Sequence, residues 1–216
     1  MKHWISLGLL CAAQIAFAAQ EVELGCKRLR VTLDARLTPS LVEQEWGSGN
    51  ERSETPAILE LIGCQGRLLD RLILDSPLAR LDPEPLRGAP NPTFLVSADL
   101  TAAAGSYNGP LTIPIQVVAD HLVAVVARDA DGRDEAIHLA LTGKSAWRKV
   151  SSRNVEHLLQ VSCQPRNQGF VTLYRRYFPT GRRWKVKARV SKGLWEADGE
   201  FPGENLFPSH PIRRGR

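Results

Sequence analysis

The sequence predicts a mainly β protein, an antiparallel sandwich or open barrel of about ten strands with one or two short helices. Many segments alternate apolar and polar residues with a period of two, and between Trp184 and Val190 every second residue is apolar while those between are basic. Turn signals rich in Gly, Pro, Asn and Asp separate these segments. The hydrophobic fraction of 43% over 216 residues is sufficient for one well-buried core.

The first 18 residues have the pattern of a secretory signal peptide. A short basic start, Met1–His3, precedes an uncharged apolar run over Trp4–Phe17, and Ala16-Phe17-Ala18 fits the small-x-small rule for cleavage. The run is shorter than the roughly 20 residues that a membrane-spanning helix needs. We therefore expect an exported, periplasmic protein with one β-rich domain over 19–200 and a flexible C-terminal tail over 201–216.

Three cysteines remain after cleavage, and an oxidising compartment favours pairing two of them. We expect a disulfide between Cys26 and Cys64. Pairing of either residue with Cys163, and the absence of any bond, are the alternatives. No C-x-x-C or C-x-x-H spacing occurs, so we expect no metal and no cofactor.

The N-terminal half begins with one expected strand over 22–33, in which the alternation changes phase near its middle and could contain a bulge. A short helix is expected over 38–47, because Thr38 suits the N-cap and Gly47 the stop. Residues 57–62 form a strand by composition. The segment 67–74 fits a helix face or a strand, and its β neighbours favour the strand.

Proline-rich residues 77–92 predict irregular chain with a one-turn helix near 83–86. Strands are expected over 93–100, 111–118, 122–128 and 137–141. Pro114 cannot donate to a ladder, so 111–118 is expected at a sheet edge or at a bulge. Ala119-Asp120 and Asp129–Asp134 are the hairpin turns between these strands.

The run from Val155 to Trp195 contains three alternating segments, separated by turns at 164–169 and 179–182. It lies within a strongly basic stretch. The formal net charge of +5 conceals 13 Lys and Arg against one acid, Glu156, over 144–192, while residues 1–143 carry 12 Lys and Arg against 18 Asp and Glu. Such a stretch on a folded sheet creates a positive face if its side chains point the same way.

We therefore expect a partner-binding surface formed by basic residues with one aromatic: Arg175, Arg176, Tyr177, Arg182, Arg183, Lys185, Lys187 and Arg189. The alternative is an ordinary solvated outer strand whose cations protect an edge from aggregation. Trp184 is expected in the core. Export makes nucleic acid an unsuitable partner. An acidic protein and anionic lipid headgroups both fit the compartment.

No catalytic constellation is recognisable. His121, His138 and His157 stand apart in sequence, and no nucleophile elbow or phosphate loop is present. The alternating acids of Asp129–Asp134 resemble part of a calcium loop, but Asp-Gly is also the commonest tight hairpin turn, and we expect the turn.

Four strings, GSYNGPLT (105–112), GKSAWRKV (143–150), GFVTLYRRY (169–177) and GLWEADGEFP (193–202), are similar to a set of uncharacterised exported proteobacterial proteins of all-β type. The resemblance covers about half of the chain. It implies an exported single domain and carries over no activity and no functional residue.

These observations predict a non-enzymatic periplasmic binding or inhibitor protein, most concretely an immunity protein that neutralises a periplasm-targeted antibacterial effector. An envelope protein that binds anionic lipid or lipopolysaccharide through the basic hairpin is the alternative. A periplasmic hydrolase is the third hypothesis.

Overall fold

A computed structural model describes residues 20–33, 56–74, 76–98, 109–167, 169–196 and 201. These residues form fifteen strands in three largely antiparallel sheets, and none of them is helical. The mainly β fold is thereby confirmed. The strand count exceeds the expected ten, because the expected strands over 22–33 and 122–128 are each divided in two and three further strands form at 79–81, 134–136 and 145–152.

The first sheet has the order β1-β2-β3-β4 and consists of β1 (Gln20–Leu24), β2 (Lys27–Thr32), β3 (Ile58–Ile62) and β4 (Leu68–Ile73). The middle sheet has the order β11-β7-β6-β5, with β8 also paired to β7. Its members are β5 (Ala79–Leu81), β6 (Thr93–Ala98), β7 (Leu111–Val118), β8 (His121–Ala124) and β11 (Leu139–Ala140).

The third sheet has the order β10-β9-β15-β14-β13-β12. Its members are β9 (Val126–Arg128), β10 (Asp134–Ala136), β12 (Ser145–Ser152), β13 (Val155–Arg166), β14 (Gly169–Phe178) and β15 (Arg183–Lys192). All of its pairings are antiparallel except β15 with β9.

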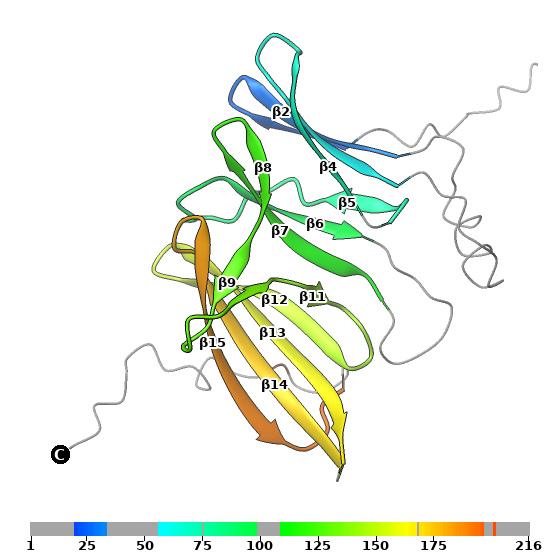
Figure 1. Cartoon of the computed structure of the whole chain (residues 1–216), viewed down its shortest axis with the longest axis vertical. Helices are drawn as coiled ribbons and strands as arrows, with labels where there is room; N and C mark the ends of the chain where they lie inside the picture. The colour runs from blue at the N-terminus through cyan, green and yellow to red at the C-terminus, as the bar shows by residue number, and fades with distance from the viewer. Residues whose placement is uncertain are drawn as a thin grey trace, which may run out of the picture.

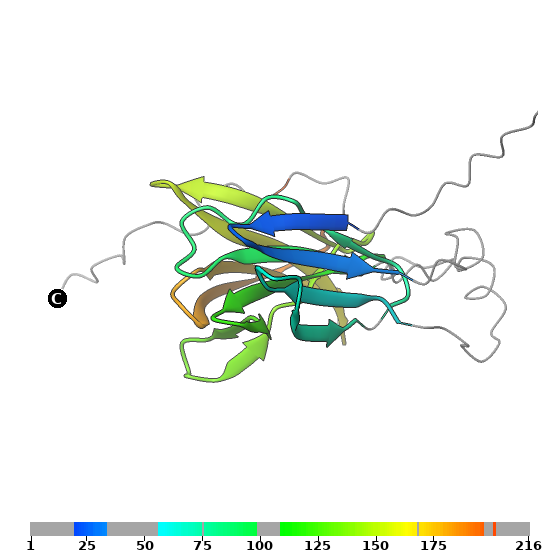
Figure 2. The ribbon, with the colours of Figure 1, turned by 90° about the horizontal axis from the view of Figure 1, so that it is seen from above.

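The three sheets follow one another along the long axis of the molecule (Figure 1), and from above β1 and β2 lie over the strands beneath them (Figure 2). Leu29 and Leu59 of the first sheet pack with Phe94 of the middle sheet in one core. Leu95, next to Phe94 on β6, packs with Trp184 of the third sheet in a second core. Because side chains alternate along a strand, β6 supplies both cores and is buried on both faces.

The single strand expected over 22–33 is wrong, because the position where the apolar–polar alternation changes phase is a turn between two strands. Strands β1 and β2 form a hairpin, and Gly25 adopts a φ of 64° between them. Glycine has no side chain to oppose this left-handed conformation. The strand over 67–74 is confirmed as β4.

The edge position expected for 111–118 is also wrong, because β7 pairs with β6 from Leu111 to Gln116 and has partners on its other side as well. On its other side, β11 pairs with Leu111 and Thr112, and β8 begins pairing at Ile115. Pro114 lies in the gap between these two partners, where its carbonyl accepts a hydrogen bond from Val125 N (2.9 Å). Proline is tolerated in this inner strand because the pairing on one side of β7 is interrupted at Pro114.

The one-turn helix expected near 83–86 is absent, and these residues form bends and irregular chain. The signal peptide and the helix over 38–47 lie outside the described residues. Of the expected tail, the structure describes Phe201, which packs against Trp195 with ring centroids 6.4 Å apart.

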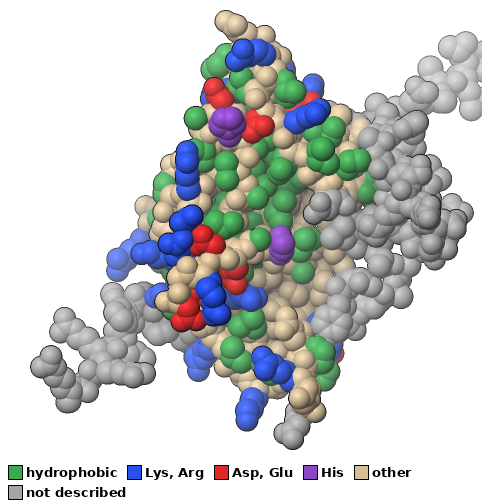
Figure 3. Space-filling model, in the orientation of Figure 1, with side chains coloured by type: hydrophobic (Ala, Val, Ile, Leu, Met, Phe, Trp, Pro, Cys, Tyr) green, Lys and Arg blue, Asp and Glu red, His purple; other side chains and the backbone are tan. Residues whose placement is uncertain are grey.

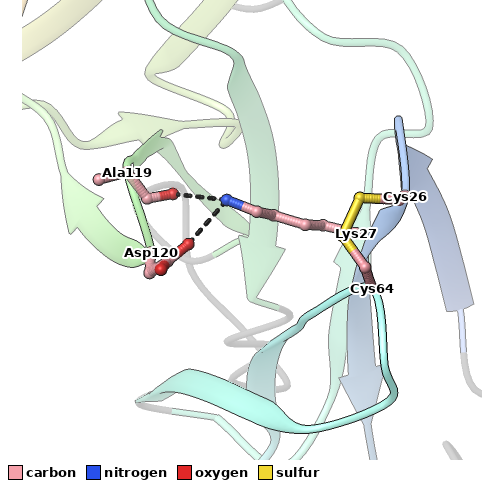
Figure 4. The surroundings of a disulfide bond; sticks show 5 residues. All are labelled: Cys26, Lys27, Cys64, Ala119 and Asp120. Atoms are coloured by element: carbon pink, nitrogen blue, oxygen red, sulfur yellow. Dashed lines mark hydrogen bonds and ion pairs between the residues drawn. A yellow bond between two sulfur atoms is a disulfide. The ribbon is translucent and has the colours of Figure 1, made fainter.

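The Cys26–Cys64 disulfide is present and joins the β1–β2 turn to the β3–β4 turn. Beside it, Lys27 Nζ donates to Asp120 Oδ1 (2.7 Å) and to the Ala119 carbonyl (3.1 Å) in the β7–β8 turn (Figure 4). The disulfide therefore lies where the first sheet is attached to the middle sheet.

Asp70 on β4 makes a second attachment between these sheets. Its carboxylate accepts hydrogen bonds from Leu122 N (2.8 Å) and Arg71 N (2.8 Å) and lies 3.5 Å from His121 Nδ1. The hydrogen bond from Leu122 is the largest of the causes that hold the pKa of Asp70 below its ordinary value.

We expect this attachment to weaken in acid. Since the pKa of Asp70 is lower in the folded than in the unfolded chain, its contribution is complete above the unfolded pKa of about 4 and is lost as pH falls through the folded pKa. Urea midpoints measured from pH 5 to pH 2 should fall less steeply in Asp70→Asn than in the wild type. The exposed Glu84→Gln is the matched control, and equal slopes for the wild type and Asp70→Asn would contradict the expectation.

Candidate functional site

The outer face of the third sheet is its side away from the middle sheet, and pairing register determines which side chains it carries. Arg176 of β14 lies opposite Lys187 of β15, and the neighbouring rows pair Tyr174 with Arg189 and Phe178 with Lys185. Paired residues share a face and alternate residues along a strand share a face, so all six project outward.

We define the basic face as five of these outward residues together with the histidine beside Phe178: Arg176, Phe178, Lys185, Lys187, Arg189 and His157. Tyr174 is left out of this definition, because it packs against the cluster of Val150 and Leu159. Lys185, Lys187 and Arg189 are exposed, Phe178 is half-buried and Arg176 is buried. The structure thus brings four of the eight predicted site residues together on one surface.

The other four predicted residues are not part of the basic face. Arg183 projects outward at the start of β15 but pairs with Asp134 (3.4 Å), and Arg182 is exposed in the preceding turn. Arg175 projects toward the inner side, where its Nε lies 3.4 Å from Glu135 Oε1. The prediction that it belongs to the same surface is wrong because of strand alternation.

Tyr177 is also misplaced in the prediction. It is 2% exposed within the second core, and its hydroxyl donates to Gln160 Oε1 (3.1 Å). Burial raises its pKa. A buried, satisfied tyrosine stabilises the sheet and cannot contact a partner. The expectation that Trp184 is a core residue is confirmed by its 0% exposure.

Phe178 is the centre of the basic face. Arg176 Cζ lies 5.3 Å from its ring centroid, Lys187 Nζ lies 5.4 Å from it, and the His157 ring packs edge-on at 4.8 Å. A cation above an aromatic ring is attracted by the electrons of the ring. One phenylalanine therefore holds two cations close together despite their mutual repulsion.

Arg176 is the most unusual member of the basic face. It is 7% exposed, and its Nε is buried without a hydrogen-bond partner. Among the described residues, no carboxylate lies within ion-pair distance of its guanidinium. A buried charge that lacks a counter-ion is costly, and stability alone would favour an apolar side chain there.

The carboxylate of Asp134, near the basic face, is already paired with arginines outside this face. Asp134 accepts hydrogen bonds from Arg128 Nε (2.7 Å) and Nη2 (3.2 Å) and also pairs with Arg183. Within the described part of the chain, Lys185, Lys187 and Arg189 have no ion-pair partner. The described acids therefore do not neutralise the positive charge of this surface.

Two lysines of the basic stretch outside this surface are neutralised by ion pairs. Lys149 pairs with Asp82 (2.6 Å), and Lys144 pairs with Glu196. Part of the excess charge counted over 144–192 is thus used in structural ion pairs, and part of it lies on the basic face. Both ion pairs join residues that are far apart in the sequence, so the charge count alone could not identify which cations are paired.

The Asp129–Asp134 segment is a hairpin turn between β9 and β10, as expected. The Asp129 carboxylate accepts from the backbone N–H groups of Asp131 and Arg133 (both 2.9 Å), and Arg133 Nη2 donates to Asp131 (2.7 Å). Acidic and basic side chains accordingly lie intermixed over β9 and β10 on the face seen in Figure 3. Arginines and backbone amides hold the oxygens that a calcium ion would need.

Phe178 and His157 belong to the basic face but not to the eight-residue surface predicted from the sequence. Phe178 stands in the basic stretch at even spacing from Arg176, so alternation gave a usable signal. His157 has no such signal, because its position opposite Phe178 follows from the β13–β14 register. Trp195 lies outside the predicted surface as well: it packs with Val161 and Cys163 on the same outer face, so this part of the sheet is covered.

A hollow of about 410 Å³ lies where Gln20, Leu78 and Ala79 approach Trp147. Its described lining contains one charged side chain, Arg80, and no carboxylate, histidine or thiol. Across the described ranges, no cluster of three His, Cys, Asp or Glu side chains is placed to hold a metal ion. Nor does the described part of the chain contain a helix long and apolar enough to cross a membrane.

Comparisons with known protein families, with curated protein sequences and with solved structures find no match for this chain. The similarity to exported proteobacterial proteins therefore stays a prediction.

Proposed function

We propose that this chain is a non-enzymatic periplasmic binding protein whose basic face captures an acidic protein partner. Its most concrete form is an immunity protein that occludes a periplasm-targeted antibacterial effector. One observation carries the proposal: Arg176, Lys185, Lys187 and Arg189 share a surface, and none of them has an ion-pair partner among the described residues.

The composition of the basic face supports binding over simple solvation. An ordinary exposed strand presents flexible cations to water, whereas here a buried arginine and a half-buried phenylalanine lie among them. Arginine and aromatic residues at the centre of a patch, surrounded by exposed polar residues, are typical of protein interfaces. The exposed lysines would then increase the rate of encounter with an acidic surface.

The scaffold supports an exported protein. The signal-peptide pattern and the Cys26–Cys64 disulfide both suit an oxidising compartment. The basic strand β15 pairs with β14 from Lys185 to Lys192 and with β9 from Arg183 to Lys185, so the sheet backbone fixes the spacing of its cations. A pre-organised surface loses little conformational entropy when a partner binds.

The test is affinity capture from a periplasmic extract with two baits, the wild type and the charge-reversed variant Lys185→Glu/Lys187→Glu/Arg189→Glu. We expect one protein to be retained by the wild type, to be released by 0.5 M NaCl, and to bind the variant at least about hundredfold more weakly. For an immunity protein, the captured partner should also lose its toxic activity when bound.

Two outcomes would contradict the proposal. Retention of the same partner by both baits would place its binding surface elsewhere. Failure to retain any protein, combined with salt-sensitive binding of wild type to vesicles containing phosphatidylglycerol, would favour the anionic-lipid function. Lys192→Glu is the matched control, because Lys192 is exposed on β15 but alternates to the inner side.

A further inference from the structure

We infer that Arg176 is the base of a carboxylate-binding site, and that the acidic partner inserts one Asp or Glu side chain there. This inference rests on the proposed function and makes it more specific. It assigns to one buried guanidinium a short-range role distinct from the general attraction exerted by the exposed lysines.

The first argument is the unsatisfied state of Arg176. Its Nε is buried without a hydrogen-bond partner, and no hydrogen bond joins its guanidinium to another described residue. Buried polar groups in folded proteins are nearly always paired, and a charged group left unpaired has the most to gain from a ligand of opposite charge. The side chain is 7% exposed, which leaves little of the guanidinium in contact with solvent.

The second argument is the environment of the guanidinium. The cross-strand partners of Arg176 are Leu159, which is 2% exposed, and Lys187. The centroid of the Phe178 ring lies 5.3 Å from Arg176 Cζ. Apolar walls lower the local dielectric constant and strengthen any ion pair formed there. Lys187 Nζ, 5.4 Å from the same ring centroid, can supply a second donor to the bound group.

The third argument selects a carboxylate over a phosphate. A planar carboxylate matches the fork of a guanidinium and carries one negative charge, which one buried arginine neutralises. Phosphate sites are usually built from several backbone N–H groups at a helix N-terminus or a turn. Here the neighbouring backbone belongs to β13, β14 and β15, whose ladders use those groups.

The test uses acetate as the probe and the full-length mature protein labelled with ¹⁵N. The Nε–Hε resonance of Arg176, assigned by its loss in Arg176→Met, is followed during titration with sodium acetate at constant ionic strength. We expect a saturable shift that chloride does not produce, and a rise in melting temperature with acetate that is absent in Arg176→Met. Lys187→Gln should bind acetate about tenfold more weakly, whereas Lys192→Gln should bind it like the wild type.

Equal effects of acetate and chloride would overturn the inference, because they would reflect general screening. Saturation by inorganic phosphate at a concentration at least about tenfold below that of acetate would also overturn it, since the site would then be a phosphate site. If Arg176→Met does not fold, Phe178→Leu replaces it and should also weaken acetate binding. Partner capture that is lost on charge reversal but unaffected by acetate would leave the proposed function intact and refute only the carboxylate site.

Discussion

Replacing Trp184 by alanine is expected to lower the free energy of unfolding by about 3–5 kcal/mol, the usual cost of removing a fully buried aromatic side chain. Trp184 is 0% exposed and packs in the second core with Leu158, Tyr177 and Val186. It also occupies the row in which β15 pairs with Ala127 of β9. The substitution therefore creates a cavity at the place where the basic strand joins the rest of its sheet.

Two control variants separate this packing effect from other effects. Trp184→Phe should cost about 1 kcal/mol, because it keeps a ring and removes an indole N–H that is buried without a hydrogen-bond partner. Lys185→Ala, at the next position but exposed, should change stability by no more than about 0.5 kcal/mol. Urea unfolding measures all three, and a loss at Trp184→Ala comparable to that at Lys185→Ala would contradict the role assigned to the indole.

The alternation around Trp184 also explains how much of the fold could be predicted. Where one face of a strand is buried and the other is wet, as in β15 from Trp184 to Lys187, the period of two identifies the strand and its buried side. The middle sheet gives a weaker signal, because β6 is buried on both faces and its sequence is almost continuously apolar. Hence most of the strands were found, whereas β5, β10, β12 and the stacking of the sheets in three layers were not.

The candidate site shows a similar limit. Sequence alternation is sufficient to place Lys185, Lys187 and Arg189 on one face, because they belong to one strand. It cannot decide which of Arg175 and Arg176 on the next strand shares that face, since the answer depends on the hairpin register. The unpaired state of Arg176 is still less predictable, because it depends on where distant carboxylates such as Asp134 and Glu135 are used.

Removing the disulfide by the paired substitution Cys26→Ser/Cys64→Ser is expected to cost about 4 kcal/mol, because the bond closes a loop with a sequence separation of 38 residues and so restricts the unfolded chain. Both cysteines lie in turns at one end of the first sheet, beside the contact of Lys27 with Asp120. We therefore expect the first sheet to become the least stable layer, with its amide hydrogens exchanging faster than those of β13 and β14.

The same variant links stability to the compartment. Treatment of the wild type with dithiothreitol should lower the urea midpoint to that of the paired variant and leave the variant unchanged, because Cys163 is a buried free thiol. Cys163→Ser is the control, and it should retain the sensitivity to reductant. A wild type whose midpoint did not respond to reductant would show that the bond does not stabilise the fold. A large response would mean that the chain reaches its full stability only where disulfides persist, which is the condition that the proposed periplasmic function requires.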